Sequence, residues 1–164
     1  MAKLITVLLL FTFLSPLTQA EDGSQLLERI ERAAQEKESD WALTQKSSHE
    51  TTLMIAFTYN KPPAAIEAPK VLITAEIAKS VEKAKSRFKE ASRVASTIPD
   101  KSGARRKKMK LNDLGEEGIS YPSLMPNMVG ITFRRGKVNV HIDASSEEAA
   151  RRFADLIAGA LTAP

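Results

Sequence analysis

The chain has 164 residues, of which 43% are hydrophobic and 27% charged, and its 24 Lys and Arg residues outnumber its 20 Asp and Glu residues to give a formal net charge of +4. The absence of Cys excludes disulfide frameworks, zinc–thiolate and iron–sulfur sites and cysteine nucleophiles, and the two His residues leave little room for a His-rich metal site. The hydrophobic content argues against wholesale disorder, and the length suits one domain with a sizeable core.

Residues 1–20 have the three-part layout of a secretory signal peptide. Lys3 supplies a basic start, residues 4–14 form an uncharged and mostly apolar run, and Ser15-Pro16 interrupts that run. The small residues Thr18 and Ala20 then favour cleavage between Ala20 and Glu21. We therefore expect a secreted or periplasmic protein with no transmembrane span in the mature chain, and its lack of Cys suits a bacterial envelope protein. A retained membrane anchor is the alternative, and the apolar run is short for it because a span needs roughly 20 residues.

The first half of the mature chain predicts a helix, three strands and a second helix. Helical spacing of apolar residues covers 23–38, and strands are expected at 41–46, 52–59 and 71–77, with a polar turn at 47–49 between the first two. Residues 53–59 and 71–77 alternate with period two, so each of these strands should bury one face. Ser80 is a suitable N-cap for a helix that reaches about Ala95.

The second half predicts an irregular basic loop near 99–127, a hairpin and a closing helix. Strands are expected at 129–133 and 138–142, joined by a tight turn at Gly136-Lys137, and Ser145 with Glu148 has the spacing of a capping box. The predicted order is α-β-β-β-α-loop-β-β-α in a single domain spanning 21–164. This order favours an α+β fold in which an antiparallel sheet of about five strands carries helices on one face.

Residues 73–95 also align with residues 138–160 without gaps, which is consistent either with an internal duplication or with chance similarity of two strand–helix segments.

The strongest surface feature is the concentration of cations between Lys101 and Lys110. Such a cluster could contact phosphate, an anionic lipid surface or an acidic polymer, or could simply be a solvated loop. Nucleic acid is disfavoured, because export removes the usual partner and few aromatic residues lie nearby for base stacking. The hairpin tip adds further cations, and Arg134 and Arg135 there should point to opposite faces of the sheet. The candidate binding residues are Arg105, Arg106, Lys107 and Lys108, with Arg135 and Lys137 as secondary candidates.

No catalytic motif is present. The sequence contains no G-x-S-x-G, P-loop, G-x-G-x-x-G or H-E-x-x-H pattern, and we expect no enzymatic activity, cofactor or metal. His49 falls in a predicted turn and His141 points away from the core, so both are expected to be surface residues. The competing hypothesis is a hydrolase of an envelope polymer that uses Glu116, Glu117 and His141. The single Trp41 is assigned to core packing.

Three short stretches form a pattern that resembles a group of poorly characterised bacterial exported proteins and lipoproteins. These stretches are Leu114-Gly115-Glu116-Glu117-Gly118, Arg135-Gly136-Lys137-Val138 and the Ala-rich segment 149–154, and the resemblance covers about a third of the chain. It departs from the group's pattern in the loop, where Glu116 stands in place of Asp and Gly118 in place of Ala, and in the turn, where Lys137 stands in place of Asn. The resemblance implies a sensor-like α+β domain outside the cytoplasm and transfers no catalytic residue.

The sequence therefore predicts an exported, non-enzymatic binding or accessory protein that contacts a protein or an anionic envelope component. Contact with a membrane surface through the basic loop is one form of this prediction. A structural subunit that buries an uncovered sheet face against a partner is a further alternative.

Overall fold

A computed structural model describes residues 23–61, 67–97 and 107–162 of the chain. The elements in chain order are α1 (Gly23–Lys37), β1 (Trp41–His49), β2 (Thr52–Tyr59), β3 (Lys70–Ile77), α2 (Val81–Thr97), β4 (Met109–Lys110), β5 (Glu117–Pro122), β6 (Val129–Arg135), β7 (Val138–Ala144) and α3 (Glu147–Ala160). Every strand pairs with its neighbours in antiparallel fashion, in the order β1-β2-β3-β7-β6-β5-β4. The predicted α+β class with an antiparallel sheet is confirmed.

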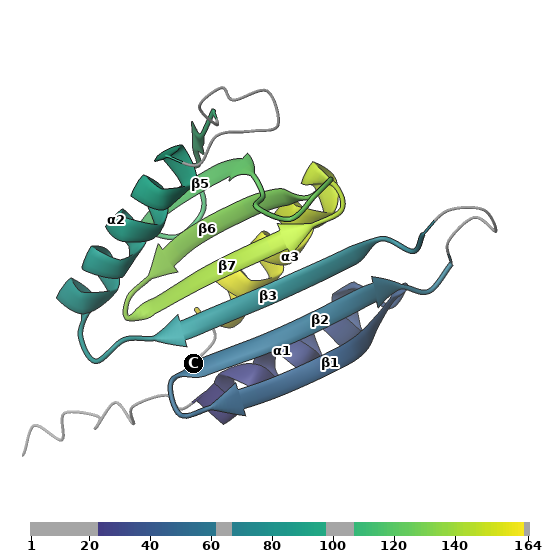
Figure 1. The fold of residues 1–164 in the computed structure, drawn as a ribbon. Helices are drawn as coiled ribbons and strands as arrows, with labels where there is room; N and C mark the ends of the chain where they lie inside the picture. Colours follow the sequence, from purple (N-terminus) through teal and green to yellow (C-terminus); the bar gives the residue numbers. More distant parts are fainter. Residues whose placement is uncertain (1–22, 62–66, 98–106, 163–164) are drawn as a thin grey trace, which may run out of the picture.

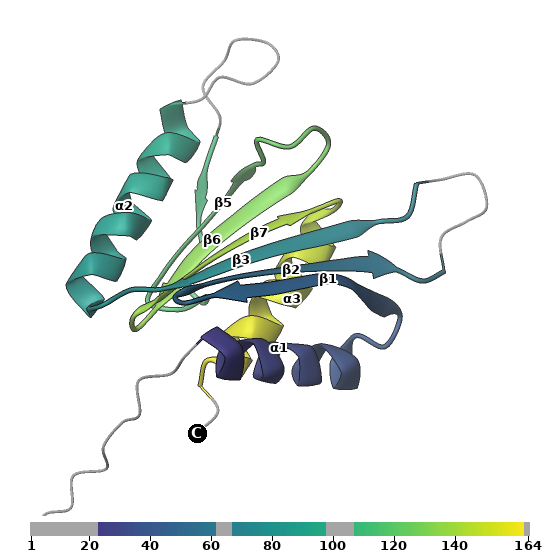
Figure 2. The same ribbon diagram turned by 60° about the horizontal axis from the view of Figure 1, so that its bottom comes forward.

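The number of strands and the placement of the helices differ from the prediction. The sheet has seven strands where about five were expected, because the region taken as an irregular loop contains β4 and β5. Helices cover both faces and not one: α1 and α3 contact each other on one face, whereas α2 contacts β6 and β7 on the other (Figures 1 and 2). The two hairpin–helix units β2-β3-α2 and β6-β7-α3 therefore send their helices to opposite sides of one sheet.

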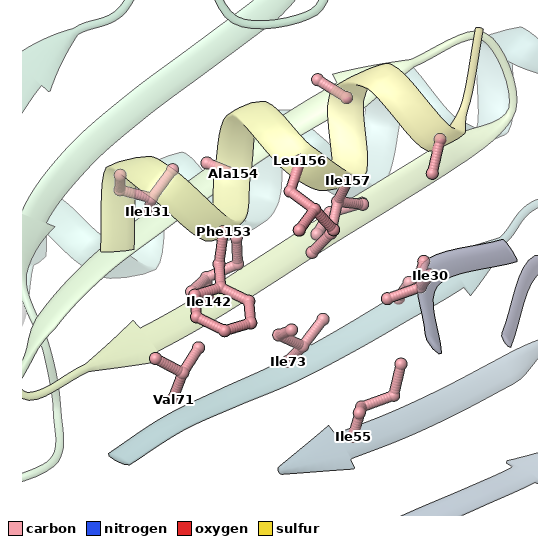
Figure 3. Close-up of a cluster of buried hydrophobic side chains, with 14 of the residues drawn as sticks. Ile30, Ile55, Val71, Ile73, Ile131, Ile142, Phe153, Ala154, Leu156 and Ile157 are labelled. Carbon is pink, nitrogen blue, oxygen red and sulfur yellow. The ribbon is translucent and has the colours of Figure 1, made fainter. Parts of the chain in front are cut away.

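The main core lies between the sheet and the pair α1 and α3. Alternate residues of β2, β3, β6 and β7 point to this side, as the period-two pattern predicts. Figure 3 shows Phe153 of α3 among Val71, Ile73 and Ile142 of the sheet, and all four side chains are buried. Trp41 packs edge-on against Phe153 with ring centroids 5.3 Å apart, so its assignment to core packing is confirmed.

Several local boundaries are also corrected. Residues 47–49 belong to β1 and do not form a turn, since the chain reverses at Glu50 and Thr51. Ser146, not Ser145, is the N-cap of α3 and accepts a hydrogen bond from the backbone N–H of Ala149 at 3.1 Å. Ser145 instead accepts a hydrogen bond from the backbone N–H of Lys70 at 2.8 Å and so links the end of β7 to the start of β3.

Two other local predictions are confirmed. Gly136 and Lys137 form the turn between β6 and β7, and Gly136 has the positive φ of 55° that favours glycine. Ser80 caps the start of α2.

The predicted signal peptide, residues 1–20, lies outside the described residues. Among the described residues, no helix is both long and apolar enough to cross a membrane.

Candidate functional site

The face of the sheet beneath α2 is polar at its centre. Antiparallel pairing places Thr74, His141 and Thr132 side by side across β3, β7 and β6, and places Asp143, Gly130 and Tyr121 side by side across β7, β6 and β5. Because successive side chains of a strand alternate between faces, these residues point away from the main core. A group of hydrogen-bonding side chains is thus gathered under a helix.

These side chains form one hydrogen-bonded network around His141. The ring nitrogen Nε2 of His141 lies 2.8 Å from Oδ2 of Asp143, and Nδ1 lies 2.8 Å from the Tyr121 hydroxyl and 2.9 Å from the Thr132 hydroxyl. The two hydroxyls are themselves 3.0 Å apart, and the Ser123 hydroxyl donates to Oδ1 of Asp143. In the neutral ring, this arrangement assigns the proton to Nε2 and leaves Nδ1 as the acceptor. We define Tyr121, Ser123, Thr132, His141 and Asp143 as the His141 network.

Burial and hydrogen bonding set the charge state of the network. Burial raises the pKa of Tyr121 to about 12, so its hydroxyl stays protonated at neutral pH. Burial also acts to raise the pKa of Asp143, but the hydrogen bonds from His141 and Ser123 outweigh it and hold that pKa below its ordinary value. The network therefore combines a carboxylate with donors that are already committed to partners.

Helix α2 rests on this face through a small apolar cluster that is separate from the main core. The cluster consists of Phe88 and Ala95 from α2 with Ile119 and Tyr121 from β5. Gly130 makes room for it, since a Cβ at this position would lie 2.7 Å from the Tyr121 ring. Among the described residues, α2 is held to the sheet by this limited apolar contact, by the buried Ala84 and by a few polar contacts, and open space remains beside the helix.

That space is a continuous cleft between α2 and the sheet. One part, of about 180 Å³, extends over Thr74, Glu76 and Asn139, and a second part, of about 430 Å³, extends to Tyr121 and Leu124. The two parts share Arg87, Ala91 and His141 and therefore adjoin. One wall is mostly apolar because it is formed by Phe88, Ala91, Val94 and Ala95 of α2, and the opposite wall is the polar sheet face. The side chain of His141 is 39% exposed, so part of its ring faces this cleft.

Polar groups also mark one end of the cleft. Arg87 on α2 forms an ion pair with Glu76 on β3, and Asn139 donates its side-chain Nδ2 to the carbonyl oxygen of Ala84 at 3.1 Å. The Oδ1 atom of Asn139 is buried and has no hydrogen-bond partner among the described residues. A buried acceptor without a partner is costly, so a water molecule or a ligand that donates to this oxygen would stabilise the cleft.

The basic residues singled out in the sequence are only partly brought together. Arg105 and Arg106 lie outside the described residues. Lys107 and Lys108 are exposed, and Lys108 donates to the hydroxyl of Ser92 on α2 at 3.1 Å. Arg135 donates to the carbonyl oxygen of Ala158 on α3, which gives it a structural partner on the other face of the sheet. Lys137 is exposed at the hairpin tip, away from Lys107 and Lys108.

The acidic pair of the hydrolase hypothesis does not meet His141. Glu116 and Glu117 both form ion pairs with Arg134, whose side chain is only 3% exposed. Glu116 also accepts from the backbone N–H of Gly136 at 2.9 Å. Glu117 lines a groove on the other flank of α2, beside Lys85 and Lys89, and that groove does not include His141. Arg134 thus binds Glu116 and Glu117, whereas Arg135 binds Ala158 of α3 on the other face of the sheet, so the predicted opposite orientation of the two arginines is confirmed.

Both ring nitrogens of His141 have hydrogen-bond partners, as do both carboxylate oxygens of Asp143, so these polar atoms are satisfied within the network. Within the described part of the chain, no group of three or more His, Asp and Glu side chains could hold a metal ion.

The sequence predicts that His141 points away from the core beside Asn139 and Asp143, but it does not predict the network around His141. The available signal was the i, i+2 spacing of His141 and Asp143 on a strand, which places both on the side away from the core. Tyr121 and Thr132 could not be added, because their contact with His141 depends on the register of β5, β6 and β7.

Comparison with known proteins gives no relative. No family model, no curated protein and no solved structure matches the chain. The resemblance to bacterial exported proteins therefore stays a prediction.

Proposed function

We propose that the protein is an exported, non-enzymatic binding protein whose ligand occupies the cleft between α2 and the sheet. The proposal is carried by one observation: α2 covers a hydrogen-bonded polar patch and leaves a cleft beside it, whereas α1 and α3 cover a continuous apolar core. Buried polar networks are costly unless every member is satisfied, and a purely structural contact is made more simply from apolar side chains.

The walls of the cleft indicate the class of ligand. The α2 side offers aliphatic and aromatic surface, and the sheet side offers hydroxyl groups and the exposed part of the His141 ring. A small amphipathic molecule, with an apolar body against α2 and hydrogen-bonding groups toward Thr74 and His141, fits both walls. This ligand site takes precedence over the basic segment, whose arginines Arg105 and Arg106 lie outside the described residues.

The test is to incubate the purified protein with an envelope extract, re-isolate it and identify retained small molecules by mass spectrometry. Ala91→Trp places an indole in the part of the cleft that both halves share and should abolish retention. Lys83→Trp is the matched control, because Lys83 is an exposed residue of α2 that lines neither half of the cleft. A compound held by the wild type and by Lys83→Trp but not by Ala91→Trp supports the proposal.

The same experiment addresses the competing hydrolase. Equal retention by all three proteins, or none by any of them, would contradict binding in the cleft. A compound that is recovered in cleaved form after contact with the wild type, and intact after contact with His141→Ala, would instead favour catalysis.

A further inference from the structure

We infer that one end of the sheet is a docking surface for an anionic lipid bilayer. This surface, the tip surface, consists of Lys107, Lys108, Met109, Leu124 and Met125. The inference goes beyond ligand binding in the cleft, with which the tip surface shares Leu124.

Two neighbouring apolar side chains, Leu124 and Met125, are exposed in the loop between β5 and β6 at this end, and Met109 is exposed on the edge strand β4. The large hydrophobic residues that are exposed within the described part of the chain are Met54, Met109, Leu124 and Met125, and three of these four belong to the tip surface. Leu124 is 59% exposed, although leucine is usually buried in a folded protein. Clustered exposed apolar residues of this kind mark surfaces that contact a protein or a membrane.

Hydrogen bonds hold the loop that carries Leu124 and Met125 in place. The backbone N–H of Met125 donates to the Ser123 hydroxyl at 2.9 Å, and the backbone N–H of Ser123 donates to the carbonyl oxygen of Met128 at 3.0 Å. Ser123 in turn donates to the buried Asp143. The outward position of the two apolar side chains is therefore fixed by hydrogen bonds to the fold.

Cations lie beside this loop. Met109 pairs with Ser120 in antiparallel fashion, so the chain just before Met109 runs beside the end of β5, where the loop begins. Lys107 and Lys108 are exposed there, and Lys108 donates to Ser92 of α2, which lines the groove beside Glu117 and not the part of the cleft that Leu124 lines. No acidic residue occurs in residues 107–112 or 118–128. Glu67 and Glu90 line hollows that also include Met125 and Leu124, and their charges are paired with Lys70 and Arg93.

Apolar side chains flanked by cations match the interface of an anionic bilayer. Leucine and methionine side chains gain free energy by entering the headgroup region, and lysines are attracted to negatively charged lipids. A soluble polyanion would satisfy the lysines but would leave Leu124 and Met125 in water. The combination favours a lipid surface over such a polymer.

Vesicle binding tests this surface directly. The described fold lies within residues 23–162, so residues 21–164 retain all of it, and a thermal unfolding curve checks that this chain and each variant fold. Vesicles of phosphatidylcholine with phosphatidylglycerol should bind the protein, vesicles of phosphatidylcholine alone should bind it at least about tenfold more weakly, and added salt should weaken binding. In Leu124→Trp, the fluorescence of the new indole should shift to the blue on binding and be quenched by brominated lipids.

Two double substitutions separate the contribution of the apolar side chains to vesicle binding from that of the lysines. The double substitution Leu124→Ser with Met125→Ser, and the double substitution Lys107→Glu with Lys108→Glu, should each reduce affinity for the anionic vesicles at least about tenfold. The controls Met54→Ser, on β2, and Lys37→Glu, on α1, should leave affinity unchanged. The inference is overturned if the wild type does not bind, if neutral vesicles bind equally well, if only the lysine substitutions matter, or if soluble heparin is bound as tightly as the vesicles.

Discussion

Tyr121 has three roles at once. Its ring belongs to the apolar cluster under α2 and stacks near the ring of His141 at a centroid distance of 6.1 Å, while its hydroxyl contacts both His141 and Thr132. Ionising this hydroxyl would place a negative charge in a buried site close to Asp143, which explains why its pKa is raised. The residue therefore links the packing of α2 to the charge state of the network.

The alkaline stability of the protein should depend on Tyr121. A folded-state pKa of about 12, above the ordinary value of 10.0, stabilises the fold fully below pH 10, and this stabilisation is lost as the pH rises toward 12. Absorbance titration of the phenolate should show one tyrosine with a midpoint near 12 that is absent in Tyr121→Phe. The wild type should also lose more stability than Tyr121→Phe between pH 10 and 12 in denaturant unfolding. A normal titration of both tyrosines in the folded protein would contradict the burial argument.

At the scale of the elements, two glycines should respond in opposite directions to the same substitution. A Cβ at Gly130 on β6 would lie 2.7 Å from the Tyr121 ring, so Gly130→Ala should push that ring out of the network and cost about 1–3 kcal/mol. Gly159 lies within α3, where an added Cβ would meet no atom within 4 Å, so Gly159→Ala should stabilise the helix by about 0.5–1 kcal/mol.

Denaturant unfolding of the two variants measures both effects, and the absorbance titration locates the first one. In Gly130→Ala, the raised midpoint of Tyr121 should fall toward its ordinary value, because the ring becomes more exposed. Equal effects of the two alanines on stability would show that β6 and β5 can adjust without disturbing Tyr121.

The elements that could be predicted are those whose apolar residues alternate along a strand or recur with the period of a helix. Strands β2, β3 and β7 show this alternation, and α1 and α3 show one apolar stripe each, so their positions followed from periodicity. Strand β5 was missed because only two apolar residues, Ile119 and Tyr121, alternate in it, between Gly118 and Pro122. In the fold both of its faces are buried: Ile119 and Tyr121 meet α2, while Gly118 and Ser120 face the main core side.

The placement of α2 and the composition of the site depend on information that a single sequence does not hold. The stripe of α2 is mostly alanine with Phe88, and it fits either face of a sheet. Which face it covers follows from the polar residues on β5, β6 and β7, and these come together only through strand pairing. Local signals thus predicted His141 as an outward-facing residue, and the register supplied its partners.

Across the whole molecule, the two sides of the sheet should differ in local stability. Helix α3 is packed into the main core and capped by Ser146, and α1 packs against it. Among the described residues, α2 relies on the four residues of a separate cluster, on the buried Ala84, on the Arg87–Glu76 ion pair and on contacts from Asn139 and Lys108. Because few buried apolar contacts mean a low free energy of local opening, α2 should detach from the sheet without global unfolding.

Native-state hydrogen exchange measures this difference. Backbone amides in the middle of α2 should exchange at least about tenfold faster than those in the middle of α1 and α3, which corresponds to an opening free energy lower by about 1.4 kcal/mol. Denaturant should accelerate α1 and α3 together, whereas α2 should exchange through an opening that exposes less surface. A ligand that occupies the cleft contacts α2 and the sheet at once, so its binding should slow exchange in α2 more than in α1. Exchange of all three helices through a single global opening would contradict the separate attachment of α2 and would make the cleft a fixed feature of the fold.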